Sequence, residues 1–336
     1  MSQKSSVKKK LTWLLLLQGW TMLWVIIGHA PLTAPVNGNI IDETSHSIAT
    51  ALFSFAYSFH MPLFIMISGY LFNMTRIEKK WQYGKMLKEK WLRLGIPYIV
   101  FITLALVLKI FMPGEVDRQV SLSLTDIVMN YIDPFNGALQ EMWFVAVIFI
   151  YFLLYPLYPL VLKTKLSIGI TFMISLLLFF IPTSGMPHIF AIDRMIHFFI
   201  YFYSGLLISR LKLEKYLGNG YMIAIGLLIF ITGYIAHIPL ITPLSGSLSF
   251  WGLAIIVDKV FTNNMFSSFR NYTYQIFLIG IFVQIAVKVL ASKMQFAGSY
   301  PIWWIICVFA GIFIPVGIAI FAQRTDNKIL KRIMGL

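Results

Sequence analysis

Two polar side chains in the first apolar segment have the spacing of one helix face. Gln18 and His29 are eleven residues apart in WLLLLQGWTMLWVIIGHA. In an α-helix this leaves them about 20° apart around the axis and about 16 Å apart along it. Histidine exchanges protons near neutral pH at its unperturbed pKa. His29 therefore suits proton transfer, but a histidine that only places its ring at a membrane boundary fits the segment as well.

The second apolar segment, SFHMPLFIMISGYLF, holds four residues of interest. Pro62 removes a backbone donor and predicts a kink. Ser68 and Gly69 allow a neighbouring helix to approach closely. His60 lies near the expected middle of the membrane, where an ionisable group is costly and often functional. It is either a neutral histidine bonded to a neighbouring helix or a residue that contacts substrate.

A basic loop, residues 74–93, separates the second and third apolar segments. Lys90 and Arg93 are its bases closest to the third segment. Clustered bases beside a membrane bind anionic lipid headgroups, and the same pair could hold a phosphate-rich donor. The sequence leaves both interpretations open.

The fourth segment begins DPFNGALQEMWF and carries Glu141 and Trp143. Glu141 is either an acid favoured by the positive end of a helix or the carboxylate that orients His29. Trp143 is typical of the aromatic belt at a membrane interface. Asp193, Arg194 and His197 form a similar cluster at the start of the sixth segment, where Arg194 and His197 are three residues apart on one face.

The composition identifies the elements that must position these groups. Of 336 residues, 59% are hydrophobic, 16% aromatic and only 12% charged, about half the charge of a soluble domain. Apolar runs of membrane-spanning length recur throughout. The sequence predicts an all-α, polytopic transmembrane helical bundle of about ten spans, forming a single domain over 1–336. The expected spans are 11–30, 48–73, 94–112, 141–161, 166–182, 194–209, 220–238, 244–261, 271–291 and 302–321.

The bases predict how these spans are oriented. If the N-terminus is cytoplasmic, 22 of the 27 bases lie on the cytoplasmic side, as the positive-inside rule requires. Ten spans then place the C-terminus there too. The net charge of +14 is therefore explained mostly by bases that orient the spans in the membrane, which argues against nucleic acid as a partner. The eighth span, 244–261, contains three serines and Asp258 and could be a broken or re-entrant segment.

Several kinds of chemistry lack their motifs. The sequence contains no phosphate-binding P-loop, no GxSxG elbow and no histidine pair with zinc-protease spacing. Its one cysteine, Cys307, can form neither an internal disulfide nor a cysteine cluster. We therefore expect no metal and no permanently bound cofactor.

Taken in order, these segments resemble the acyltransferase-3 family of integral membrane acyltransferases, which includes polysaccharide O-acetylases and fucose 4-O-acetylase-like proteins. WVIIGH resembles the family's first-span histidine segment. FHMPLFIMISGYLF closely resembles its second-span motif and is the most specific of these resemblances. LKEKWLRLGIPYIVF resembles its basic segment before a proline-containing third span. EMWFVAVIFIYFLLYP resembles its fourth-span motif, and later spans fit more loosely.

The resemblance implies that an acyl group, expected to be acetyl, passes from cytoplasmic acyl-CoA to a hydroxyl of a cell-surface glycan or its lipid-linked precursor. Acyl-CoA would be a co-substrate, and the protein would lie in a bacterial cytoplasmic (inner) membrane. His29 would be the family's essential histidine, Lys90 and Arg93 its basic pair for the donor, and Trp143 its fourth-span tryptophan. His29 could act as a general base or carry the acyl group covalently.

The sequence also departs from the family. Leu15 and Gln18 stand where members usually have an acid and a base, and Gly280 stands where many have a histidine. Gln18 would line a polar path that lets the donor reach His29.

The oxyanion formed during acyl transfer needs hydrogen-bond donors, for which Gln18, Trp143 and Ser68 are candidates. Two alternatives involve no acyl transfer: a transporter or flippase of a lipid-linked sugar, and a structural subunit. A carrier would consume no acyl-CoA, and a structural subunit would not need His29.

Overall fold

A computed structural model describes residues 2–31, 43–111, 121, 123–261, 265–294 and 300–336, and within them it contains helices and no strand. The predicted all-α fold is thus confirmed. The chain forms two compact units, Met1–Phe64 with Lys212–Phe321, and Ile65–Leu211 with Ala322–Leu336. Each is described by itself below, as unit 1 and unit 2. The assignment of 1–336 to a single domain stays a prediction.

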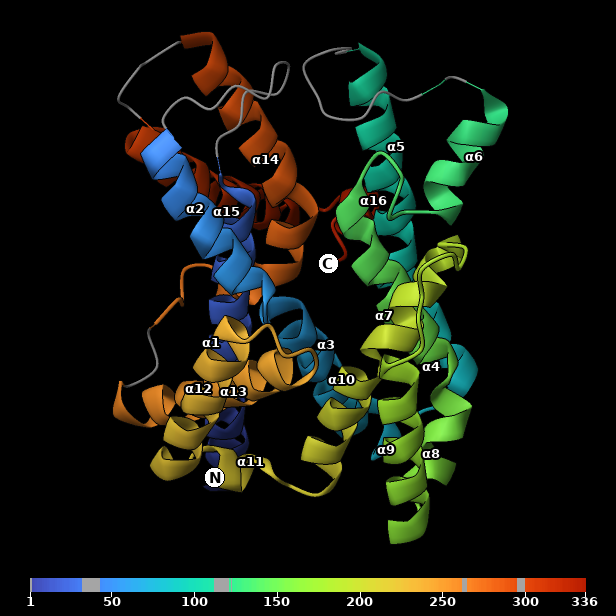
Figure 1. Ribbon diagram of the computed structural model, residues 1–336. Helices are drawn as coiled ribbons and strands as arrows, with labels where there is room; N and C mark the ends of the chain where they lie inside the picture. Colours follow the sequence, from blue (N-terminus) through green and yellow to red (C-terminus); the bar gives the residue numbers. More distant parts are fainter. Residues whose placement is uncertain (1, 32–42, 112–120, 122, 262–264, 295–299) are drawn as a thin grey trace. The chain divides into compact units, whose positions relative to one another are not determined.

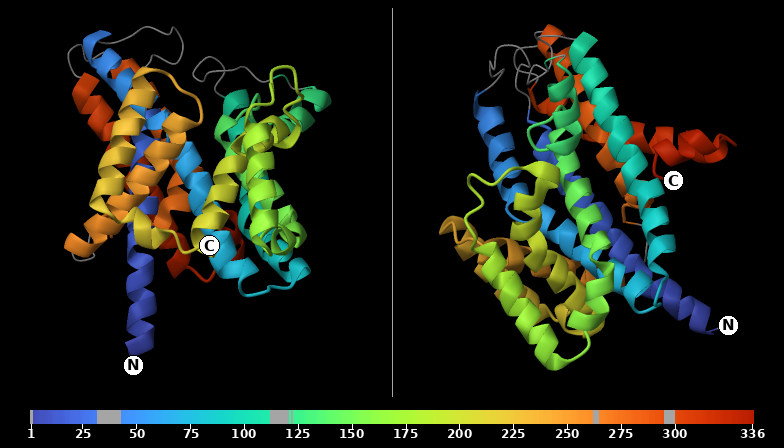
Figure 2. Two further views of the ribbon diagram at one scale, coloured as in Figure 1. Left: turned by 60° about the horizontal axis from the view of Figure 1, so that its bottom comes forward. Right: turned by 90° about the vertical axis from the view of Figure 1, so that its right-hand side faces the viewer.

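Unit 1 is built around the long first helix. Helix α1 packs against α2, α13 and α14, and α12 packs against α13 (Figures 1 and 2). Its apolar core includes Met22, Ile26, Ile276 and Cys307. The helices of this unit are α1 (Ser2–His29), α2 (Glu43–Tyr57), the start of α3 (His60–Phe72), α11 (Glu214–Leu217), α12 (Gly220–Ile235), α13 (Ile241–Val260), η6 (Arg270–Tyr272), α14 (Thr273–Met294) and most of α15 (Tyr300–Arg324).

Unit 2 has an aromatic core, in which the rings of Phe72 and Phe152 stack and Tyr151 packs on Phe202. Helix α10 lies beside α7 and α9 (Figure 1). The helices that follow α3 in this unit are η1 (Asn73–Ile77), α4 (Tyr83–Lys90), η2 (Trp91–Gly95), α5 (Ile96–Phe111), α6 (Leu124–Ile132), η3 (Gln140–Met142), α7 (Trp143–Leu153), η4 (Tyr155–Leu157), α8 (Tyr158–Val161), α9 (Lys165–Phe179), η5 (Ile189–Ala191), α10 (Ile192–Arg210) and α16 (Lys328–Ile333).

Two glycines set the close contact between α3 and α10. A Cβ at Gly69 would overlap the backbone carbonyl of Phe202, and a Cβ at Gly205 would overlap that of Met66. The predicted close approach of a helix at Gly69 is therefore confirmed, and Gly205 contributes equally from the other side.

Seven helical segments among the described residues are long and apolar enough to cross a membrane. An eighth is counted if Gln140–Leu153 and Tyr155–Val161 form one span, which is bent by 44° at the break between them. The fifth and seventh expected spans correspond to α9 and α12, of 15 and 16 residues. At 1.5 Å per residue these helices are shorter than about 30 Å of hydrocarbon. The chain is a polytopic membrane protein, while ten spans stay a prediction.

Two breaks between helices lie just before proline residues. Helix α2 ends at Tyr57 and α3 begins at His60, because the Pro62 ring excludes a regular helical turn over the preceding residues. This confirms the predicted kink. The bend in the fourth segment falls at Leu154, directly before Pro156 and Pro159.

The eighth segment is one continuous helix, α13, so the broken or re-entrant form left open by the sequence is excluded. Two of its three serine hydroxyls have backbone acceptors. Ser245 donates to the carbonyl of Ile241, one turn earlier, and Ser247 donates to Phe59. Hydroxyls satisfied in this way do not interrupt a helix.

Candidate functional site

His29 is the last residue of α1, and two polar contacts hold that helix in unit 1. Near its start, Thr12 donates a 2.7 Å hydrogen bond to the Asp258 carboxylate of α13. Near its end, the Gln284 amide of α14 donates to the Ile26 carbonyl at 2.8 Å. A carbonyl in the last turn has no partner within its own helix, so Gln284 satisfies an otherwise orphaned group next to His29.

A tyrosine contacts the His29 side chain. Tyr57, the last residue of α2, places its hydroxyl 2.9 Å from His29 Nε2. Gly28 leaves the space, since a Cβ there would lie 3.2 Å from the Tyr57 ring. A phenol can donate to an imidazole nitrogen or accept from it. Either way the bond orients the ring.

His60 also contacts this tyrosine. It is fully buried, and its ring meets the Tyr57 ring edge-on with centroids 4.6 Å apart. Nδ1 lies 2.6 Å from the Ala56 carbonyl and donates to it, which leaves Nε2 as an acceptor. Nε2 has no hydrogen-bond partner among the described residues. His29, Tyr57 and His60 thus form one cluster, which we call the histidine–tyrosine cluster.

Gln18 also belongs to unit 1. Because α1 is unbroken from Ser2 to His29, the predicted common face of Gln18 and His29 and their separation of about 16 Å hold. The Gln18 side chain is half-buried. The polar path along this face of α1 stays a prediction.

Unit 2 holds the predicted basic pair where α4 gives way to η2. Lys90 ends α4, and Arg93 lies within the five-residue π-helical turn of η2, a local form often found at functional sites. The Lys90 ammonium lies 4.0 Å from the centre of the Phe152 ring and 5.9 Å from that of Phe72. It makes no ion pair with a described carboxylate. Arg93 is exposed.

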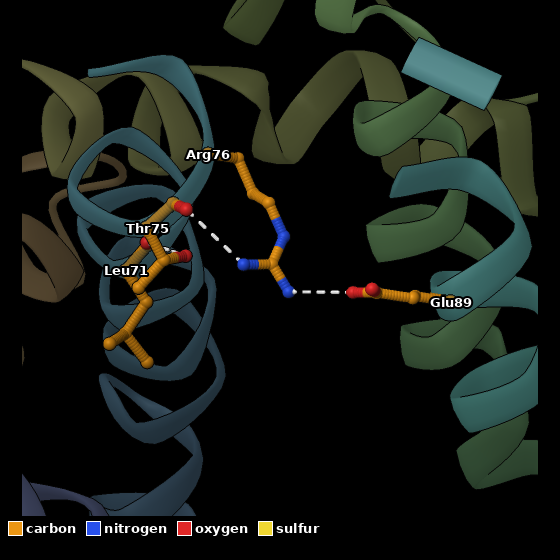
Figure 3. A network of polar contacts seen from close by, with 4 residues as sticks. All are labelled: Leu71, Thr75, Arg76 and Glu89. Atoms are coloured by element: carbon orange, nitrogen blue, oxygen red, sulfur yellow. Dashed lines mark hydrogen bonds and ion pairs between the residues drawn. The ribbon is translucent and has the colours of Figure 1, made fainter. Parts of the chain in front are cut away.

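Arg76 is a third cation at this place. Figure 3 shows its guanidinium reaching from η1 toward Glu89 of α4, with Nη2 3.2 Å from Glu89 Oε2 and Nη1 bonded to the Thr75 carbonyl. The guanidinium also lies 4.0 Å from the Trp81 ring centre. Arg76 and Arg93 both lie close enough to repel the Lys90 charge. Lys90 therefore has two cations and the carboxylate of Glu89 close to it, and the excess positive charge suits an anion.

The remaining predicted residues also lie in unit 2. Ser68 is half-buried in α3, Glu141 lies in η3, and Trp143 begins α7 with its ring 5.2 Å from that of Phe198. The suggested pairing of Glu141 with His29 would join the two units and stays a prediction.

Residue type alone could not have identified Tyr57 or Arg76. Tyr57 is one of 16 tyrosines, and its position three residues before His60 has meaning only once the helix break between them is known. No three histidine, cysteine, aspartate or glutamate side chains gather in the described part of the chain so as to hold a metal.

These features define a helical membrane protein whose described residues include a histidine–tyrosine cluster and a cationic site. Residues 11–320 match the model of the acyltransferase-3 family, described as an acyltransferase domain. The chain belongs to this family of membrane acyltransferases, as its sequence motifs predicted. No curated protein and no solved structure matches it.

Proposed function

We propose that the protein transfers an acyl group, most simply acetyl, from cytoplasmic acyl-CoA to a hydroxyl of a cell-surface glycan or of its lipid-linked precursor. Family membership supports acyl transfer as the reaction. The donor and the acceptor are proposals, as is the location in a bacterial inner membrane.

The observation that carries the donor assignment is the Lys90 ammonium. It is held against two ring faces rather than by a carboxylate, and two further cations lie beside it. Burying a cation that makes no ion pair is costly, and the nearby Glu89 carboxylate already pairs with Arg76, so this arrangement favours an anionic ligand. The phosphates of CoA supply such charge, and charge-assisted hydrogen bonds to them are about twice as strong as neutral ones.

The distance along α7 supports the transfer. Trp143 is the first residue of α7 and Phe152, beneath Lys90, is the tenth. The helical rise between them is about 13.5 Å, less than half the thickness of the hydrocarbon core. An extended pantetheine arm spans such a distance, so a CoA whose phosphates meet Lys90 can bring its thioester to the Trp143 end of α7.

His29 acts as the base in this proposal. The acceptor oxygen bonds to the thioester carbonyl carbon while the imidazole takes the hydroxyl proton. The carbon–sulfur bond then breaks and the sulfur receives that proton, so the products are an ester and free CoA thiol. A base positioned in this way contributes on the order of 10²–10⁴ in rate. In the covalent alternative, the imidazole first forms a bond to the acyl group, which then passes to the acceptor hydroxyl.

The test compares the glycan mass of cells with and without the gene, and the CoA released by purified protein from acetyl-CoA. We expect a mass shift of one acyl unit and one CoA released per ester formed. His29→Asn should lower the rates of ester formation and CoA release by about 10²–10⁴. The matched control is His237→Asn, since His237 is exposed and its φ of 52° suits asparagine.

The two alternatives give different results. A carrier of a lipid-linked sugar would change the amount or location of glycan and release no CoA. Wild-type acylation in the His29→Asn variant would overturn the role of His29.

A further inference from the structure

A second polar cluster occupies the amino-terminal ends of α7 and α10 in unit 2. Asp193 is the second residue of α10, and His188 comes just before η5. Between them, Phe190 and Ala191 both have left-handed backbone conformations, with φ of 48° and 55°, which non-glycine residues seldom adopt. This turn places His188 Nδ1 2.9 Å from Asp193 Oδ2.

The Asp193 carboxylate is buried and only half satisfied. Its side chain is 4% exposed, and Oδ2 also lies 3.5 Å from Arg194 Nε. Oδ1 is buried and has no hydrogen-bond partner among the described residues. Because a buried acceptor without a donor is costly, most such groups in proteins are paired. The arrangement points to a donor from outside the chain.

Aromatic rings flank the polar groups. The Arg194 guanidinium lies 4.2 Å from the Phe135 ring centre and 6.0 Å from that of Trp143. The His188 ring packs on Phe135 with centroids 5.4 Å apart. The side chains of His188 and Arg194 remain 33% and 35% exposed, so a ligand can approach the cluster between them, next to the buried Asp193 carboxylate.

The chemistry of this cluster matches a neutral sugar. Each sugar hydroxyl both donates and accepts, so one hydroxyl can donate to Asp193 Oδ1 while a neighbour accepts from Arg194. The C–H faces of a sugar are apolar and pack on rings such as Phe135 and Trp143. One aspartate and one arginine balance in charge, which favours an uncharged polyol over an anion.

We propose that Phe135, Trp143, His188, Asp193 and Arg194 bind one neutral sugar unit of the acceptor. This rests on the proposed function for its biological meaning, but the binding itself requires no acyl transfer. Asp193 and Arg194 are the groups that fix the sugar's orientation.

The experiment measures binding and transfer separately on the purified full-length protein in detergent. The probes are the nitrophenyl glycosides of glucose, galactose, fucose and N-acetylglucosamine. Saturation-transfer-difference NMR gives their dissociation constants. Labelled acetyl-CoA gives the KM for glycoside, the KM for acetyl-CoA and kcat.

The variants are Asp193→Asn, Arg194→Gln and, in case the buried change prevents folding, Phe135→Leu. Asp126→Asn is the matched control. Asp126 is exposed in α6, and hydrogen bonds from Ser121 and Ser123 hold its pKa below the usual range. It is therefore ionised at neutral pH, so the control removes an acidic charge from the same unit.

We expect at least one glycoside to bind. Loss of a charge-assisted hydrogen bond should weaken its binding, and raise its KM, about tenfold to a hundredfold in Asp193→Asn and Arg194→Gln. The KM for acetyl-CoA should not change, and Asp126→Asn should behave as wild type.

Lowered melting temperature with unchanged glycoside affinity in the variants would mean a purely structural cluster and would overturn the proposal. Absence of binding of all four glycosides to wild type, up to their solubility limits, would do the same. Binding that the variants lose, in a protein that transfers no acyl group, would uphold this inference and defeat the proposed function instead.

Discussion

The Tyr57→Phe substitution isolates one hydrogen bond at His29. It removes the hydroxyl that lies 2.9 Å from His29 Nε2 and keeps the ring that packs on His60 and Phe53. A hydrogen bond between neutral groups contributes about 0.5–1.5 kcal/mol. If the bond serves to orient the base, kcat should fall about twofold to tenfold, and the KM for acetyl-CoA should stay the same.

The assay is a double-mutant cycle on CoA release by purified protein. His29→Asn alone should lower kcat by about 10²–10⁴. Adding Tyr57→Phe to it should have no further effect, because the hydroxyl then has no base to orient. Tyr234→Phe is the matched control, since Tyr234 makes ring contacts with Phe55 and Phe230 in the same unit. The reasoning is refuted if Tyr57→Phe costs the same factor in the His29→Asn background, or if it leaves kcat unchanged.

Three further predictions concern the donor site and the packing of each unit. Lys90→Gln should raise the KM for acetyl-CoA about tenfold to a hundredfold through the lost charge, whereas the exposed Lys165→Gln should not, as steady-state kinetics would show. Gly205→Ala should destabilise the protein by about 1–3 kcal/mol, because its Cβ meets backbone. Gly169→Ala, where a Cβ meets nothing within 4 Å, should instead stabilise α9 by about 0.5–1 kcal/mol, and thermal unfolding in detergent measures both. Gln284→Met should cost about 1–3 kcal/mol by leaving a buried carbonyl of α1 without its donor, seen as an earlier unfolding transition.

Hydropathy located most of the helices because a membrane span is a long apolar run, whereas helix ends depend on local chemistry that hydropathy does not register. Helix α9 ends at Phe179, three residues before Pro182, and α12 ends at Ile235, before Pro239. Both therefore stop short of the ends expected from hydropathy alone. The serines of α13 suggested a broken helix where the helix is continuous, since the sequence does not reveal that the Ser245 hydroxyl bonds to its own helix and that of Ser247 to Phe59.

Some residues of the candidate site could be identified from the sequence, and others only from the structure. His29, Lys90 and Arg93 were found by residue type and by their family motifs, because a base and a pair of cations are unusual beside apolar spans. Tyr57 was missed because it gains its role from the break that separates α2 from α3. Asp193 and Arg194 were noticed as charges near a span, but only the structure shows the left-handed turn that faces His188 toward the aspartate.

Helix α7 carries a contact between a cation and an aromatic ring near each of its ends. Pro156 lacks a backbone donor, and α7 ends at Leu153, directly after Phe152. Lys90 therefore lies over the last turn of α7, while Arg194 lies over the ring at its first residue, Trp143. Nine residue steps, about 13.5 Å of helical rise, separate Trp143 from Phe152. If Lys90 holds the donor and Arg194 the acceptor, as we propose, the acyl group has to cover only this distance, which is less than half the thickness of the hydrocarbon core.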